Sequence, residues 1–153
     1  MVARYFFDAS ALVKRYATEI GSEWVEAVCQ DGEAVIVIAS LSVVEVVSAI
    51  RRKARSGEMT PTTRDRSLTG LQRHLRRQYV QIHLRTGVIT EASRVLAFHP
   101  LKASDAVQLA SAMAAKRGRT ARGRGLRFVA ADGQLLEAAR RSGFDVEDAN
   151  VLG

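Results

Sequence analysis

The sequence alternates between short apolar runs and longer segments in which apolar residues recur at helical spacing. The apolar runs predict strands at residues 4–8, 34–39, 79–82, 127–131 and 144–146. The run at 34–39 consists of β-branched residues and alanine without a polar position, which is typical of a parallel strand covered by helices on both faces. The strand pattern therefore predicts a buried, mainly parallel sheet.

Helical spacing and capping residues predict helices in the segments between these strands. Their expected ranges are 11–16 behind a Ser10 cap, 22–30, 40–56 behind Ser40 or Ser42, a helix that begins at Thr60-Pro61, 86–98, 102–116 and 133–142. In the helix over 86–98, the side chains expected to face inward are Val88, Ala92, Val95 and Leu96. Strands that alternate with helices predict the α/β class, with helices on both faces of the sheet.

Four carboxylates lie in positions where a globular fold would otherwise place apolar residues. Asp8 and Asp132 each end a predicted strand, Asp105 lies in the first turn of a predicted helix, and Glu45 interrupts a valine-rich helix. In open parallel sheets the carboxyl ends of the strands form the ligand site. The four acids can therefore converge at one edge of the sheet.

Each of these acids also has an ordinary structural explanation. Asp8 and Asp132 can cap the helices that follow them, and Asp105 can interact favourably with the dipole of its helix. Glu45 has no capping role, so its alternative is a buried ion pair. Four acids without a matching buried base would repel one another, and they would take up protons or bind a divalent cation.

The chemistry of the acids indicates which cation would suit them. Ligands that are all oxygen favour Mg²⁺ or Mn²⁺ over zinc. Such ions activate water and stabilise the leaving oxygen in a phosphoryl displacement. The three histidines, His74, His83 and His99, are scattered without ligand spacing, so we expect structural or surface roles for them.

The net charge of +7 points to a polyanionic partner. A basic balance favours nucleic acid or an anionic membrane surface, and an acidic protein partner is equally compatible with it. Solubility alone is the ordinary explanation of such a charge. Residues 116–125 are rich in lysine, arginine and glycine, and they predict a basic loop. That loop would be either a solvated connector or a strap for phosphates.

The single cysteine and the absence of long apolar stretches indicate the cellular compartment of the protein. Cys29 has no partner for an intrachain disulfide, which suits a reducing cytoplasm. Neither a signal peptide nor a span of roughly 20 apolar residues is recognisable. We therefore expect a cytoplasmic protein with no membrane partner, in which residues 1–153 form one domain.

Four segments carry the acids in this order: FDASALVK at 7–14, SVVE at 42–45, LKASDAVQLA at 101–110 and FVAADGQLL at 128–136. Together they extend over nearly the whole chain. They resemble the PIN-domain nucleases, and specifically the VapC-type ribonuclease toxins of prokaryotic toxin–antitoxin pairs. The resemblance implies a PIN-like three-layer α/β/α sandwich with a mainly parallel central sheet.

The resemblance also implies a metal-dependent activity and the residues that perform it. Asp8, Glu45, Asp105 and Asp132 would form the acidic pocket that holds Mg²⁺ or Mn²⁺, and Ser10 would orient Asp8 by hydrogen bonding. Water activated by the metal would attack an RNA phosphodiester, leaving a 5′-phosphate and a 3′-hydroxyl.

Three partners follow from the same resemblance. The RNA substrate would pass along the basic residues Arg51, Arg52, Lys53 and Arg55. Members of the family usually form homodimers, and a cognate antitoxin silences them by placing its C-terminal segment in the groove beside the active site. The target RNA can be a transfer, ribosomal or messenger RNA, and the residues do not decide between them.

Two other classes of function remain open on the sequence. A receiver-type phosphotransfer domain also carries acids at strand ends, but Glu45 would have no task in it and no lysine ends a late strand. A basic nucleic-acid-binding module without catalysis, including a PIN fold that has lost its activity, explains the net charge. It does not explain the acids, which would repel phosphates if no metal were bound.

Overall fold

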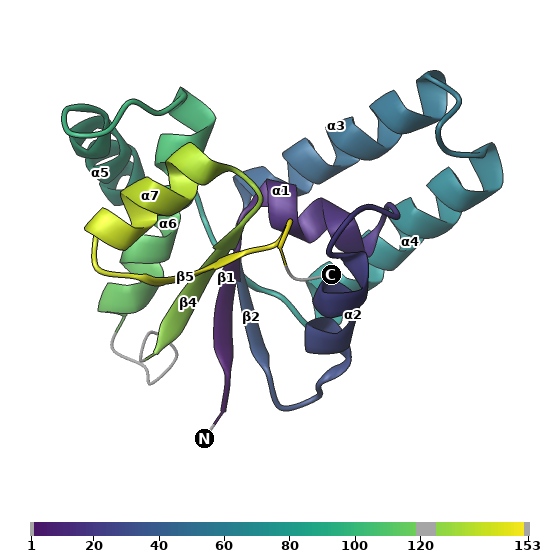
Figure 1. Cartoon of the computed structure of the whole chain (residues 1–153), viewed down its shortest axis with the longest axis horizontal. Coiled ribbons are helices and arrows are strands. Elements are labelled where there is room, and N and C mark those ends of the chain that lie inside the picture. Colours follow the sequence, from purple (N-terminus) through teal and green to yellow (C-terminus); the bar gives the residue numbers. More distant parts are fainter. Residues whose placement is uncertain (1, 119–124, 152–153) are drawn as a thin grey trace.

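The strands form one parallel sheet. The computed structural model describes residues 2–118 and 125–151 (Figure 1). The strands are β1 (Arg4–Phe7), β2 (Val35–Ala39), β3 (Val80–Ile82), β4 (Leu126–Ala130) and β5 (Asp145–Asp148). They are ordered β3-β2-β1-β4-β5, and every adjacent pair is parallel. The α/β class predicted from the sequence is confirmed, and the described sheet is parallel throughout.

The helices lie in the predicted segments, with most ends within two residues of those expected. They are α1 (Ala9–Leu12), continued by the 3₁₀ turn η1 (Val13–Arg15), α2 (Ser22–Gln30), α3 (Leu41–Arg55), α4 (Pro61–Arg77), α5 (Thr86–Leu96), α6 (Ala103–Arg117) and α7 (Gly133–Arg141). None of the described helices combines the length and apolarity needed to cross a lipid bilayer.

Helices cover both faces of the sheet, which gives the molecule three layers. Successive residues of a strand point to opposite faces, so neighbours in β1 belong to different cores. Phe6 packs with residues of α5, α6 and α7, whereas Phe7 packs with residues of α1 to α4. Figure 1 shows these two groups of helices on opposite sides of the strands.

Two predictions about the helices were wrong. The first helix begins at Ala9 rather than at residue 11, because Asp8 is already extended and its own carboxylate caps the helix. Leu96 is 43% exposed, although Val88, Ala92 and Val95 are buried as expected. Leu96 lies one position beyond Val95 in the last turn of α5, and this turns its side chain away from the buried stripe.

The predicted basic loop at 116–125 is described only at its ends, since residues 119–124 lie outside the described residues. Lys116 and Arg117 close α6 and are engaged within the fold. The Lys116 ammonium donates to the Gly143 carbonyl at 2.8 Å, and Arg117 donates to Glu91 at 3.2 Å. These two cations therefore hold α6 to its neighbours.

The strand order creates a ligand position at the end of β1. The chain passes from β1 outward to β2 and β3, and later returns to the opposite side of β1 to add β4 and β5. Where the strand order of an open parallel sheet reverses in this way, the carboxyl ends of the two neighbouring strands border the binding site. Asp8 follows β1 and Asp132 follows β4, so both lie at this point.

Candidate active site

Asp8 is a buried acid at the carboxyl end of β1. Its Oδ1 accepts a hydrogen bond from the Ala11 amide at 2.9 Å, and the side chain is only 3% exposed. Burial raises the pKa of this carboxyl to about 7, although hydrogen bonds from Ser10 and Ala11 favour the charged form. The negative charge of Asp105 raises the pKa further. Asp8 therefore caps α1 and is also an acid whose charge is poorly compensated.

Ser10 ties Asp8 to the end of β4. Its hydroxyl lies 2.7 Å and 2.8 Å from the two carboxylate oxygens of Asp8, to which it donates. The same oxygen accepts the Ala131 amide at 2.9 Å. The Ala131 carbonyl in turn accepts from the Asn150 side chain at 3.0 Å. The expected cap role of Ser10 is not observed, and its hydroxyl instead restrains the Asp8 carboxylate.

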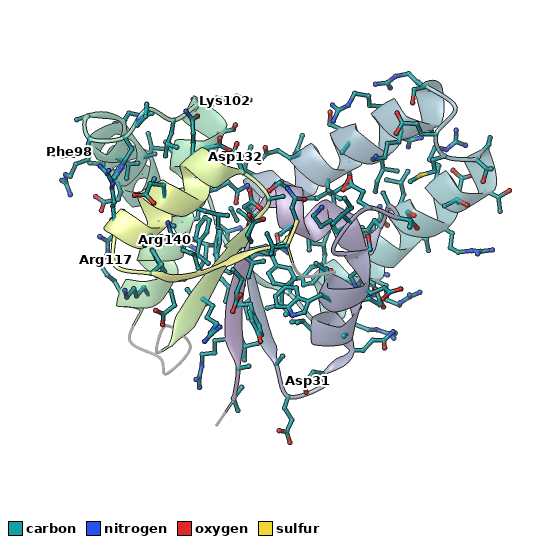
Figure 2. The ribbon with its side chains drawn as sticks, in the orientation of Figure 1. Asp31, Phe98, Lys102, Arg117, Asp132 and Arg140 are labelled. Carbon is teal, nitrogen blue, oxygen red and sulfur yellow. The ribbon has the colours of Figure 1, made fainter. Side chains whose placement is uncertain are left out.

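Asp132 caps α7 from the carboxyl end of β4. Its Oδ1 accepts hydrogen bonds from the amides of Gln134 at 2.9 Å and Leu135 at 3.2 Å. Figure 2 shows Asp132 at the start of α7 and Lys102 just before α6, both on the side of the sheet toward which β1 runs. The capping role considered for Asp132 is confirmed, and Oδ2 makes no hydrogen bond with a described residue.

Asp105 is the common neighbour of the other three acids. Burial raises the pKa of its carboxyl, and the charge of Asp132 raises it further, whereas the cation of Lys102 lowers it. Its own charge in turn raises the pKa values of Asp8 and Glu45. Within the described part of the chain, no side chain or amide donates a hydrogen bond to Asp105. Each of the other three predicted acids thus lies close enough to Asp105 for their charges to interact.

Glu45 is half-buried on α3 and faces α6. Burial raises the pKa of its carboxyl, the hydrogen bond from Gln108 lowers it, and the charge of Asp105 raises it again. Gln108 Nε2 donates to Glu45 Oε1 at 2.8 Å. The buried ion pair considered for Glu45 is not present among the described residues, because its partner is a neutral amide.

The donor set fits Mg²⁺ or Mn²⁺ in chemistry, but it does not form a complete cage. Across residues 2–118 and 125–151, no three carboxylate, imidazole or thiol groups stand close enough together to surround one ion. The acids instead couple in pairs through Asp105. Mg²⁺ commonly uses one or two carboxylates and completes its shell with water and substrate phosphate. A site of paired carboxylates therefore fits that ion.

Most of the net charge lies on α3, α4 and the turn between them. Residues 41–77 contain nine lysines and arginines against three acids, which leaves +6 of the chain's +7. Figure 1 shows α3 and α4 as two long helices that project away from the sheet. Seven arginines here are exposed and form no salt bridge with a described residue: Arg51, Arg52, Arg55, Arg66, Arg73, Arg76 and Arg77.

The predicted RNA-binding residues of α3 do not share one environment. Arg52 follows Glu45 by seven residues, so it lies on the same face of α3 about 10 Å further along the axis. Lys53 lies on another face, where its ammonium is 3.6 Å from Glu19 and 3.4 Å from Glu58. The charge of Lys53 is therefore already partly compensated by carboxylates. Arg51, Arg52 and Arg55 form no salt bridge with a described residue.

A cleft of about 730 Å³ lies away from the acids. It is bordered by η1, α2 and the turn between α3 and α4, and its lining includes Lys14, Arg15, Lys53 and Glu58. None of the four acids lines it. Despite its volume, we do not assign this cleft as the candidate active site, because the carboxylates lie elsewhere, at the carboxyl edge of the sheet.

The comparison with family models decides the family. The model of the PIN domain matches residues 5–141, a range that includes all four acids. This chain belongs to the PIN domain family. A search among curated protein sequences found no match. The strand order agrees with this membership and differs from the 2-1-3-4-5 order of receiver-type domains, which removes that alternative.

Several solved structures share this fold at low sequence identity. PAE2754 of Pyrobaculum aerophilum has a TM-score of 0.65 at 21% identity, covering 99% of this chain and 95% of that one. VapC20 of Mycobacterium tuberculosis, a toxin that cleaves the sarcin–ricin loop, has a TM-score of 0.63 at 14% identity. The match covers 92% of this chain and 95% of VapC20. DNA-bound VapBC of Salmonella typhimurium has a TM-score of 0.58 at 15% identity, and the match covers 97% of this chain and 99% of that one. At these identities the PIN fold is what the likeness establishes.

Two contributors to the candidate site were missed from the sequence. The Ala131 amide reaches Ser10 from a distant segment, and no side-chain pattern signals such a backbone contact. Gln108 did leave a signal. It is a polar residue between Ala106 and Leu109 in an otherwise apolar part of α6, one turn after Asp105.

Proposed function

We propose that this PIN-domain protein is an Mg²⁺- or Mn²⁺-dependent endoribonuclease and the toxin of a toxin–antitoxin pair. The observation that carries the proposal is the charge coupling of one buried carboxylate, Asp8, and the half-buried carboxylates Glu45 and Asp132 with Asp105. Burial and mutual repulsion raise the pKa values of Asp8, Glu45 and Asp105 together. Such an arrangement costs free energy unless a cation compensates it.

We propose that carboxylates from four different elements hold the ion. Asp8 follows β1, Asp105 lies in the first turn of α6, Glu45 lies on α3, and Asp132 caps α7. A bound Mg²⁺ or Mn²⁺ would supply an activated water and would neutralise charge on the RNA phosphate. Ser10 keeps the Asp8 carboxylate in one orientation, since its hydroxyl reaches both oxygens.

The basic surface of α3 and α4 is the proposed path of the RNA. A pocket of four acids repels a polyanion, so the substrate needs cations nearby. Arg52 stands on the Glu45 face of α3, and Arg51 and Arg55 flank it. On α4, Arg66 and Arg73 continue the exposed basic surface. We propose that these arginines bind RNA phosphates and guide the strand to the acids.

The proposed protein partners are a cognate antitoxin and a second copy of the chain. Support for the antitoxin comes from structural relatives that were solved as VapBC assemblies from Salmonella typhimurium and Rickettsia felis. For a second copy, two exposed apolar side chains near opposite ends of α5 offer a contact: Ile89 in its first turn is 51% exposed, and Phe98, two residues past its last residue, is 76% exposed. Light scattering coupled to size exclusion would give the mass of a dimer if the second proposal holds.

Cleavage of RNA by the purified chain tests the activity. We expect cleavage with Mg²⁺ or Mn²⁺, loss of cleavage in excess chelator, and products with 5′-phosphate and 3′-hydroxyl ends. Glu45→Gln and Asp105→Asn should each reduce the rate at least about 100-fold. Glu137→Gln is the matched control, because Glu137 is an acid on α7 that already pairs with Arg140. Cleavage that persists in chelator, or in Asp105→Asn, refutes the proposal.

A PIN fold without catalysis is the alternative, and one observation favours it. The described residues do not gather three metal-ligating groups around one point. Tight RNA binding without cleavage under Mg²⁺, Mn²⁺ or other divalent ions would support that alternative.

A further inference from the structure

Gln108 is a buried amide that joins the two helices carrying Glu45 and Asp105. Its side chain is 1% exposed. Nε2 donates to Ser42 Oγ at 2.8 Å and to Glu45 Oε1 at 2.8 Å. The opposite orientation of the amide would set Oε1 against the carboxylate of Glu45, so only the observed orientation makes this hydrogen bond.

The spacing of these residues explains why one amide can serve two helices. Ser42 and Glu45 are three residues apart on α3, and Asp105 and Gln108 are three residues apart on α6. Residues at this spacing are neighbours on the surface of a helix. The amide therefore spans from the acid-bearing face of α6 to the acid-bearing face of α3.

Burial of this amide is unfavourable for the fold by itself. Gln108 Oε1 is buried and has no hydrogen-bond donor among the described residues. A buried polar atom without a partner destabilises the folded state, and an apolar side chain of similar size would avoid that cost. The amide is thus better explained by what Nε2 does for Glu45 than by core stability.

A neutral donor suits this position better than a cation would. A lysine or arginine at this place would pair with Glu45 and neutralise it, which would compete with a divalent ion for the carboxylate. An amide fixes one oxygen of Glu45 by a hydrogen bond and leaves the negative charge in place. The other oxygen, Oε2, makes no hydrogen bond with a described residue.

We propose that Gln108 is a positioning residue that holds the Glu45 carboxylate in the orientation needed to bind the divalent cation. The inference rests on the proposed function, since it assumes that Glu45 belongs to a cation site. Gln108 acts through Glu45, and Ser42 helps to fix the amide by accepting a second hydrogen bond from the same Nε2.

Mn²⁺ binding to the purified chain, measured by electron paramagnetic resonance of the free ion, tests this role without RNA. We expect Gln108→Met to weaken Mn²⁺ binding about tenfold, the size of effect typical for residues that orient metal ligands. Gln72→Met is the matched control, because Gln72 is exposed on α4, and its affinity should equal that of the unaltered protein. Ser42→Ala should produce a smaller loss than Gln108→Met.

A double-mutant comparison separates positioning from a general structural role. In a Glu45→Ala background, Gln108→Met should change Mn²⁺ affinity no further, because the residue through which it acts is gone. An equal loss in both backgrounds would overturn the inference, and so would unchanged affinity in Gln108→Met. If Gln108→Met does not fold, Gln108→Leu takes its place, since a leucine side chain likewise cannot donate to Glu45.

The outcomes distinguish this inference from the proposed nuclease. If the unaltered protein binds Mn²⁺ through Glu45 and Gln108 but cuts no RNA, the inference stands and the nuclease proposal fails. If it cuts RNA and Gln108→Met binds Mn²⁺ normally, the nuclease proposal stands and the inference fails. A protein that binds no Mn²⁺ overturns the inference.

Discussion

The hydroxyl of Ser10 donates to both carboxylate oxygens of Asp8, at 2.7 Å and 2.8 Å, and so restrains the most deeply buried acid of the site. Because the same oxygen accepts the Ala131 amide, the carboxyl ends of β1 and β4 are joined at the point where the strand order reverses. The candidate site is therefore held together by a contact between neighbouring strand ends.

Removal of the Ser10 hydroxyl should impair both stability and activity. Ser10→Ala leaves the Ala131 amide without its acceptor, which should cost about 1–3 kcal/mol of unfolding free energy. RNA cleavage should fall about 10- to 100-fold, because Asp8 loses its restraint. Ser93→Ala is the control, since Ser93 bonds only the Ile89 carbonyl of its own helix. Chemical denaturation and single-turnover cleavage measure the two effects, and equal behaviour of the two variants would contradict the role given to Ser10.

Asp8→Asn should abolish cleavage and stabilise the metal-free protein at neutral pH. The pKa of Asp8 is raised to about 7 by burial, from an ordinary value near 3.8. Between these two values the folded state binds more protons than the unfolded state, so stability falls as pH rises from about 4 to 7. Asparagine cannot ionise, so the variant avoids this loss of stability. Its unfolding free energy at pH 7.5 should be higher by about 1–4 kcal/mol. Thermal melting in chelator measures the effect, and a lower melting temperature for Asp8→Asn would be inconsistent with a costly buried charge.

Cation binding should release protons near neutral pH. A group with a pKa of about 7 is half protonated at pH 7, and a divalent ion must displace that proton to use the carboxylate. Mn²⁺ affinity should therefore rise between pH 6 and pH 8, with release of about half a proton per ion at pH 7. Calorimetry in two buffers that differ in ionisation enthalpy gives this number. Binding that is independent of both pH and buffer would show that Asp8 is not a ligand.

The exposed arginines of α4 should make RNA binding sensitive to salt. Arg66, Arg73 and Arg77 recur at spacings of seven and four residues, which places them along one line of the helix. Replacing all three by glutamine should reduce the slope of log affinity against log salt by about 2 for single-stranded RNA. The measurement is fluorescence anisotropy in an Asp8→Asn background, so that no substrate is cut.

The control for this prediction replaces arginines that already have acidic partners. Arg94 pairs with Glu91, and Arg140 and Arg141 pair with Glu137. Glutamine at these three positions should leave the salt slope nearly unchanged. Equal slopes for both triple variants would refute α4 as part of the RNA path.

The fold was largely predictable because its strongest signals are local. The β-branched run that forms β2, and the Thr60-Pro61 start of α4, follow from periodicity and capping alone. The start of α1 was wrong because two residues, Asp8 and Ser10, both suit an N-cap, and the contact to Ala131 that decides between them is distant in sequence. Glu45 was found because it interrupts an apolar helix. The hydrogen bond from Gln108 to Glu45 was not predicted, because this contact depends on how α3 packs against α6.

Anomalous diffraction from crystals of the protein soaked in Mn²⁺ tests the central claim most directly. The account predicts an ion at the carboxyl ends of β1 and β4, about 2.1 Å from carboxylate oxygens of Asp8 and Asp105. The peak should disappear in Asp105→Asn crystals and remain in Glu137→Gln crystals. No ion at this edge of the sheet, or an ion bound elsewhere on the chain, would contradict the assignment of these acids as one cation site.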